Sequence, residues 1–414
     1  MDNTQKEWLL PDLIKSIESE IIDQYLNDKF DRPWIIGFSG GKDSTMLLQI
    51  VWYALSKIPK DLLKRSVHIV CNDTLVENPI ATNLVDSTLE LIQNTIIKHD
   101  LPFYIKKTIP VLKDSFWVKL VGRGYAAPTN HFRWCTKRLK ITPTTDYILD
   151  TIGNNGSAIV LIGTRKDESI RRANTIERYT DNNTRLQKHT IPNIFVFSPI
   201  KEVRTEEVWE YLSSVPPPWD RNHHKLITLY RNASDGDCPL VIDTYTPSCG
   251  KSRFGCWVCT VVSKDNSIES LIDRGEEWLT PLSDIREYLL EIRAGREKYR
   301  YTERRKEAKK KGFLGPYLPE TRYKILEKIL KTQKEIGNKT RLISKEELLL
   351  IQQEWEIDNI TEYNAISLYQ DIFNDNSSEI RFLESLGEVP IIRKKRPRRK
   401  KIKQISLMKY EFNR

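Results

Sequence analysis

The chain has 414 residues, of which 29% are charged and 39% hydrophobic, enough for two or three domains at about 150 residues each. No segment approaches the roughly 20 consecutive apolar residues that a membrane-spanning helix needs. The N-terminus lacks the basic region and apolar core of a signal peptide. These features exclude channels and membrane transporters, and they predict a cytoplasmic protein with no membrane partner.

The net charge of +10 is concentrated in two segments. Arg393–Lys403 contains nine basic residues and no acidic one, and Arg293–Lys311 contains ten basic and three acidic residues. Such segments attract phosphate backbones without reading their sequence, although a basic run can also be a solvated face or tail. The presence of two of them favours a nucleic-acid partner.

The first 200 residues alternate between strand and helix patterns after an amphipathic helix at 4–28. The predicted strands are 34–38, 67–71, 103–107, 158–163 and 194–198, and the predicted helices are 43–57, 79–99, 137–152 and 205–213. This alternation predicts an α/β fold with a doubly wound, mostly parallel sheet. Ligands of such sheets bind beyond the carboxyl ends of the strands.

The second half of the chain has a different character. Residues 214–265 lose the periodicity and contain four of the six cysteines, and a loop-rich segment of that length needs an anchor. Helical pattern returns over 268–370. We therefore predict an N-terminal helix (1–30), an α/β domain (31–213), a cysteine-rich segment (214–265), a helical region (266–380) and a basic, mobile tail (381–414).

The most informative motif is Ser39-Gly-Gly-Lys-Asp-Ser44, which follows the first strand and opens a helix. Glycine amides and a helix N-terminus together make a cradle for phosphate. The motif is not a Walker loop, because Asp43 follows Gly41-Lys42 and Ile36 stands where that loop needs its first glycine. An ordinary glycine-containing turn is the alternative, and six matched positions after a strand disfavour it.

The expected roles at this site follow from side-chain chemistry. Lys42 offers a compact positive charge to the β- or γ-phosphate, and Asp43 is expected at an exposed helix start. Asp73, after the second strand, could orient the ribose or a Mg²⁺ ion, or could simply be a turn residue. The predicted catalytic residues are Lys42, Asp43 and Ser44, and the predicted ATP-binding residues are Ser39, Gly40, Gly41, Lys42, Asp43, Ser44, Asp73, Gly163 and Arg165. Further side chains could donate hydrogen bonds to phosphate, although each could also be a plain surface residue. They are Lys137, Arg138, Arg171 and Arg172.

The cysteines form a second constellation. Cys256 and Cys259 make a CxxC pair, Cys249 lies seven residues upstream, and Cys135 is far away in sequence. Four thiolates can bind zinc or an iron–sulfur cluster, and spacing alone does not decide the metal. Cys71 lies in an apolar strand and is expected to be a core thiol. Cys238 could be a ligand, a sulfur-carrying thiol or a loop residue.

Four motifs together resemble a known family. They are SGGKDST, HFRWCTKRLKITP at 131–143, GTRKDESIRR at 163–172 and TPSCGKSRFGCWVCTVV at 246–262. The chain resembles the DndC-type DNA phosphorothioation sulfurtransferases, within the wider phosphoadenosine phosphosulfate (PAPS) reductase or PP-loop family, over about residues 30–355. One departure is that no cysteine follows Cys259, whereas PAPS reductases carry a catalytic cysteine on a C-terminal tail. Reduction of PAPS by that route is therefore not expected.

The resemblance implies an ATP pyrophosphatase fold of the adenine nucleotide α-hydrolase type, with ATP and Mg²⁺ as cofactors. It implies a [4Fe–4S] cluster held by Cys135, Cys249, Cys256 and Cys259. It also implies a role in replacing a non-bridging phosphate oxygen of DNA with sulfur. The implied partners are DNA, a cysteine desulfurase as sulfur donor, and the other subunits of a DNA phosphorothioation complex.

Two other functions remain open from the sequence. One is a tRNA thiolation enzyme of the same superfamily, although the chain shows no recognisable RNA-binding module. The other is a DNA-binding scaffold in which ATP acts as a switch and the cluster is structural. Release of pyrophosphate from ATP separates an enzyme from a scaffold.

Overall fold

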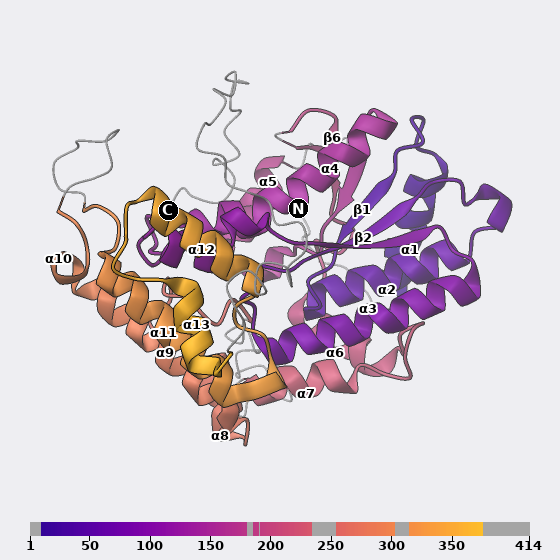
Figure 1. The fold of residues 1–414 in the computed structure, drawn as a ribbon. Coiled ribbons are helices and arrows are strands. Elements are labelled where there is room, and N and C mark those ends of the chain that lie inside the picture. The colour runs from indigo at the N-terminus through magenta and orange to yellow at the C-terminus, as the bar shows by residue number, and fades with distance from the viewer. Residues whose placement is uncertain (1–9, 180–184, 190, 234–253, 303–313, 376–414) are drawn as a thin grey trace.

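The structure is a computed structural model that describes residues 10–179, 185–189, 191–233, 254–302 and 314–375. A six-stranded sheet with its covering helices lies on the right of Figure 1, and the C-terminal helices, in orange and yellow, lie on the left. This confirms the predicted α/β fold with a mostly parallel sheet and a helical C-terminal part. The basic segment at 393–403 and part of the one at 293–311 fall outside the described residues.

The sheet is parallel except at one edge. Its strands are β1 (Trp34–Gly37), β2 (Val67–Asn72), β3 (Phe103–Thr108), β4 (Ala158–Leu161), β5 (Gln187–Lys188) and β6 (Ile194–Phe197). They lie in the order β3-β2-β1-β4-β6-β5, and only β5 is antiparallel to its neighbour. The five parallel strands were predicted, whereas the two residues of β5 are too few to show an alternating pattern.

The strand order places a binding crevice beside β1. From β1 the chain moves outward through β2 to β3, and it then returns to build β4 and β6 on the other side. The connections after β1 and β4 therefore diverge at the carboxyl edge of the sheet. This switch point is where open α/β sheets bind their ligands.

Helices cover both faces of the sheet. Those of this part are α1 (Leu10–Leu26), α2 (Lys42–Ser56), α3 (Pro79–His99), α4 (Thr142–Asn155), α5 (Ile170–Tyr179), α6 (Thr205–Ser214) and α7 (His224–Ala233). Trp34 and Ile36 face the larger core, which also holds residues of α1, α2, α3, α6 and α7, whereas Ile35 faces a smaller core under α4. The helix α7 lies in a segment expected to be loop-rich, and it forms because its apolar residues make one buried stripe.

The C-terminal helices build a further core, separate from the two that cover the sheet. They are α8 (Asn266–Asp273), α9 (Thr280–Ala294), α10 (Arg296–Tyr299), α11 (Pro319–Ile336), α12 (Lys345–Ile357) and α13 (Ala365–Phe373). This core also holds buried residues between 116 and 139, so the α/β part and the helices pack as neighbours. The indole of Trp355 donates to the Val121 carbonyl at 3.0 Å, and the buried Arg322 donates to the Gly122 carbonyl at 3.0 Å. Among the described helices, none is both long enough and apolar enough to cross a membrane.

Candidate functional site

The loop between β1 and α2 has a backbone that only glycine at position 40 can provide. Gly40 has a φ of +71°, in the left-handed region, and a Cβ atom there would collide with Val85 Cγ2 of α3. Gly41 follows in extended conformation and caps α2. The chain thus turns sharply from the end of the strand into the start of the helix.

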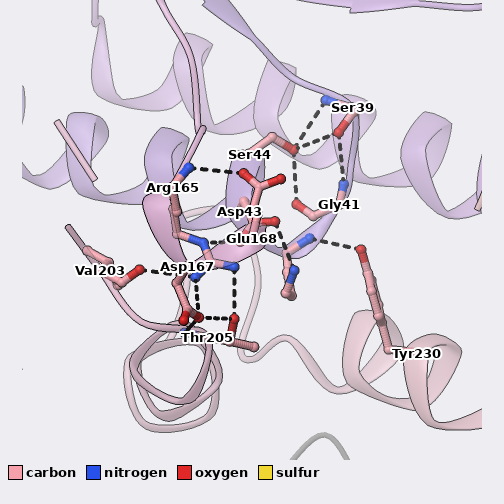
Figure 2. A network of polar contacts seen from close by, with 11 residues as sticks. Ser39, Gly41, Asp43, Ser44, Arg165, Asp167, Glu168, Val203, Thr205 and Tyr230 are labelled. Carbon is pink, nitrogen blue, oxygen red and sulfur yellow. Dashed lines mark hydrogen bonds and ion pairs between the residues drawn. The ribbon is translucent and has the colours of Figure 1, made fainter. Parts of the chain in front are cut away.

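Two serine hydroxyls hold this loop in shape (Figure 2). Ser44 Oγ donates to the Gly41 carbonyl at 2.9 Å and accepts from the Ser39 amide at 3.2 Å. The two hydroxyls lie 3.1 Å apart, and the Gly41 amide donates to Ser39 Oγ at 3.4 Å. The loop is therefore pre-shaped by its own side chains, and the roles of these serines toward phosphate stay predictions.

The carboxylate of Asp43 joins two cations. Its Oδ2 lies 2.9 Å from Lys42 Nζ, and its Oδ1 accepts from Arg165 Nε at 2.7 Å. The side chain of Asp43 is 22% exposed and that of Arg165 only 1% exposed. The expectation of an exposed Asp43 was wrong, because the loop after β4 closes over it.

Arg165 is the centre of a buried clamp. Besides Asp43, its guanidinium donates to the Val203 carbonyl at 3.0 Å and to Thr205 Oγ1 at 3.2 Å. Asp167 accepts from the Thr205 amide at 2.8 Å; burial alone would raise the pKa of Asp167, but the Thr205 hydrogen bonds and the Arg165 charge hold it below its usual value. The clamp connects the starts of α2 and α6 with the loop after β4, as Figure 2 shows. An ATP-binding role for Arg165 stays a prediction, and its described contacts are those of a positioning residue.

The remaining predicted site residues lie in the loops after β2 and β4 and in α5. A Cβ atom on Gly163 would lie 2.9 Å from the Asp43 carbonyl oxygen, so glycine lets the two loops approach. Asp73 accepts from the Leu75 amide at 2.8 Å and lies 3.0 Å from Lys107 Nζ, which are the contacts of a turn residue. A role for Asp73 with ribose or Mg²⁺ stays a prediction. Arg171 and Arg172 belong to α5.

Tyr230 is a site residue that the sequence did not reveal. Its hydroxyl on α7 accepts a hydrogen bond from the Lys42 amide at 3.3 Å, at the start of α2 (Figure 2). Burial raises the pKa of Tyr230 to about 12, so the hydroxyl stays protonated at neutral pH. It lies 188 positions from Lys42 in the chain, and no local motif marks it.

The CxxC turn docks against the loop that follows β2. The Trp257 amide donates to the Val76 carbonyl at 3.0 Å, and the Thr74 hydroxyl lies 3.3 Å from Cys256 Sγ. Burial and the nearby Glu77 raise the pKa of Cys256, although the charge of Lys140 opposes them. Burial and the Cys259 thiol raise the pKa of Cys135, which precedes the π-helical turn Thr136–Ile141. Three of the four predicted ligands are therefore neighbours.

The chemistry of these donors suits an iron–sulfur cluster, because all are thiols and they come from two separate segments. Among the described residues, however, no three His, Cys, Asp or Glu side chains are arranged to hold a metal ion. Cys249 and Cys238 lie outside the described residues. The [4Fe–4S] cluster therefore stays a prediction. Cys71 is buried in β2, where burial raises its pKa to about 12, as expected for a core thiol.

The sequence profile of the phosphoadenosine phosphosulfate reductase domain matches residues 33–262. The chain belongs to the PAPS reductase family. The matched range contains the glycine-rich loop, Arg165 and the CxxC turn. This family lies in the PP-loop superfamily of ATP-using enzymes, which agrees with the glycine-rich loop at the switch point.

Known proteins that are similar to this PAPS reductase family member include the following three. An uncharacterized protein of Methanocaldococcus jannaschii is 25% identical over 232 residues, which is 56% of this chain and 37% of that protein. This chain therefore matches little more than a third of that relative. The crystal structure of PAPS reductase from Candida auris is 14% identical with a TM-score of 0.31, covering 54% of this chain and 92% of that one. The U34-tRNA thiolase NcsA from Methanococcus maripaludis, with its [4Fe–4S] cluster, is 13% identical with a TM-score of 0.32, covering 73% and 84%.

Proposed function

We propose that this protein is an ATP pyrophosphatase and sulfurtransferase that replaces a non-bridging oxygen of a DNA backbone phosphate with sulfur. The observation that carries the proposal is the Ser39–Ser44 loop, preformed at the switch point and opening α2. The motif resemblance to DNA phosphorothioation proteins supports DNA as the acceptor. The family membership supports the use of ATP.

The residues of the loop suit binding of a pyrophosphate group. Backbone amides at the start of α2, together with the helix dipole, favour negative charge there. Lys42 Nζ contacts Asp43 Oδ2, and the Lys42 side chain is 14% exposed. Rotation of this side chain away from Asp43 would offer its charge to a β- or γ-phosphate. Asp43 itself is held by Arg165 and would stay in place as Lys42 moves. A Mg²⁺ ion would offset the remaining charge of ATP.

The proposed reaction has two displacements at phosphorus. A non-bridging oxygen of the DNA phosphate first attacks the α-phosphorus of ATP, and pyrophosphate leaves. A sulfur nucleophile at the oxidation level of sulfide then attacks the DNA phosphorus, and AMP leaves with the oxygen. Activation is needed because an unmodified phosphate oxygen is a poor leaving group.

Cys135, Cys249, Cys256 and Cys259 would hold the [4Fe–4S] cluster, and because four thiolates would ligate all four irons, the cluster would supply electron transfer rather than a binding site for sulfur. The cysteines of the CxxC turn dock beside Thr74, which follows β2 at the carboxyl edge of the sheet. Sulfur would come from a cysteine desulfurase as a persulfide, and a cellular reductant would supply the two electrons that bring it to the sulfide level. The other subunits of a DNA phosphorothioation complex would be the partners.

Product analysis tests this proposal. Purified protein should convert ATP to AMP and pyrophosphate, and ADP as the main product would contradict the assignment. Mass spectrometry of digested DNA and tRNA, from cells with and without the gene, should find the added sulfur in DNA. Sulfur in tRNA alone would identify a tRNA thiolation enzyme, and no nucleotide cleavage would favour an ATP-switched scaffold.

A further inference from the structure

A groove of about 990 Å³ lies beyond the carboxyl end of β3. Its walls are the end of β3, the loop at 130–134, the π-helical turn and the first turns of α4. The Asn72 side chain, at the end of β2, donates to the Leu139 carbonyl at 3.0 Å and so ties this wall to the sheet. The groove therefore shares the carboxyl edge of the sheet with the Ser39–Ser44 loop.

The groove is lined mainly by positive charge. Its charged lining comprises Lys106, Lys107, Arg133, Lys137 and Arg138, against Asp114, Asp146 and Asp150. Asp114 is paired with Arg138 at 2.7 Å and Lys119 at 2.6 Å, and Lys107 is paired with Asp73 at 3.0 Å and Asp86 at 2.8 Å. The remaining charged lining is Lys106, Arg133 and Lys137 against Asp146 and Asp150. The excess of cations complements a phosphodiester backbone.

An aromatic side chain stands exposed in the same lining. Phe132 is 48% exposed, and its ring centroid lies 6.4 Å from that of Tyr125. Tyr125 in turn packs edge-on against the buried Trp134, with centroids 5.4 Å apart. Phe132 is thus an exposed apolar ring supported by packed aromatic side chains. Stacking of a flat group on this ring would remove its apolar surface from water. Across the groove, Lys106 Nζ lies 5.7 Å from the centroid of the Tyr147 ring.

We infer that this groove binds a single-stranded stretch of DNA, with one base stacked on Phe132 and the backbone along Lys106, Arg133 and Lys137. Aromatic rings beside basic side chains are the usual elements of sites for single-stranded nucleic acid. Stacking on Phe132 requires a base that has left its own stack, so the bound strand must be locally unpaired. The inference rests on the proposed function, because it supplies the acceptor site for the sulfur.

The position of the groove fits this role. Trp134 and Lys137 line it, and Cys135 lies between them at the start of the π-helical turn. The wall of the groove therefore belongs to the same turn as a cysteine predicted to take part in sulfur chemistry. The bound DNA strand would lie at the same edge of the sheet as the predicted ATP site.

The test measures binding of a fluorescein-labelled 20-nucleotide DNA strand by fluorescence anisotropy, over a range of salt concentrations. Phe132→Ala should weaken binding between about 5-fold and 100-fold, the range expected for losing one base–aromatic stack. Lys137→Ala should reduce the slope of log affinity against log salt by about 0.7, the value for one phosphate contact with a single strand.

Matched control variants lie at other surfaces. Phe30→Ala removes another exposed phenylalanine, and Lys98→Ala removes an exposed lysine near the end of α3; neither should change binding. Groove variants that bind like the unchanged protein would overturn the inference, as would tighter binding of single-stranded RNA of the same sequence. Mass spectrometry of DNA from cells with and without the gene reports separately on the proposed function, so the two can fail independently.

Discussion

The guanidinium of Arg165 and the carboxylate of Asp43 form an ion pair, with 2.7 Å between Arg165 Nε and Asp43 Oδ1. It joins the loop after β4 to the first turn of α2, at the point where the sheet is expected to hold ATP. Lys42 uses the other carboxylate oxygen at 2.9 Å. Asp43 therefore holds two cations, Arg165 with a side chain that is 1% exposed and Lys42 with one that is 14% exposed.

This double contact predicts that Asp43→Ala affects stability as well as activity. Arg165 would keep its bonds to Val203 and Thr205 but lose a charged partner while buried. We expect the free energy of unfolding to fall by about 2 kcal/mol, the usual size for a hydrogen bond to a charged group, and pyrophosphate release to be abolished. Urea denaturation measures the first effect.

The matched control is Lys42→Ala, which removes the cation at the mouth and leaves the buried pair. It should abolish most pyrophosphate release while lowering the free energy of unfolding less than Asp43→Ala does, because the buried ion pair stays intact. Equal stability of Asp43→Ala and the unchanged protein would show that the pair with Arg165 does not stabilise the fold.

The sequence predicts the local structure around Asp43 but not the contacts that Asp43 makes with distant residues. The apolar run before Ser39, the two glycines and the helical spacing after them are local signals, so the loop and its place after β1 were predictable. Arg165 was placed near the site because its strand ends there, but its burial against Asp43 depends on a contact between residues 122 positions apart. The Tyr230 hydroxyl and the packing of Trp117 among the C-terminal helices depend on tertiary structure alone.

Tyr230 and a bound phosphate would compete for the same amide. The hydroxyl of Tyr230 accepts from the Lys42 N–H, which a phosphate cradle would offer to ATP. Tyr230→Phe should therefore bind a non-hydrolysable ATP analogue up to about fivefold more tightly, the equivalent of one modest hydrogen bond. Isothermal titration calorimetry measures this affinity. Tyr211→Phe, which removes another buried hydroxyl, should leave it unchanged, and weaker binding by Tyr230→Phe would refute the competition.

The cysteines allow a direct test of the iron–sulfur prediction. Anaerobically purified protein should be brown and contain about four irons per chain with little zinc. Cys256→Ser and Cys259→Ser should lose the iron and the colour, because each removes a predicted ligand. Cys71→Ala, a buried thiol in β2, is the control and should retain both. A colourless protein with one tightly bound zinc would show that these cysteines form a zinc site and not a cluster.

The basic segment Arg393–Lys403 lies outside the described residues, and its charge alone supports a prediction. Truncation near residue 390 should weaken binding to duplex DNA and flatten its salt dependence, by about 0.9 log units per log unit of salt for each phosphate that the segment would neutralise. Filter binding at several salt concentrations measures the slope. ATP cleavage should be unaffected, and an unchanged slope would exclude this segment from DNA binding.

The last prediction concerns acid stability and His223. His223 Nε2 donates to Gln49 Oε1 at 2.6 Å, because the Gln49 amide nitrogen donates to the Val215 carbonyl at 3.1 Å. Burial lowers the pKa of His223 from 6.5 to about 4, although Asp220 opposes the shift. The unfolded chain therefore binds a proton that the folded protein does not, and stability falls as the pH falls from about 6.5 to about 4. Between pH 8 and pH 5 this histidine should cost about 2 kcal/mol in the free energy of unfolding. Urea denaturation at both pH values should show a smaller decrease in His223→Gln than in the unchanged protein, and equal decreases would show that His223 is not the group responsible.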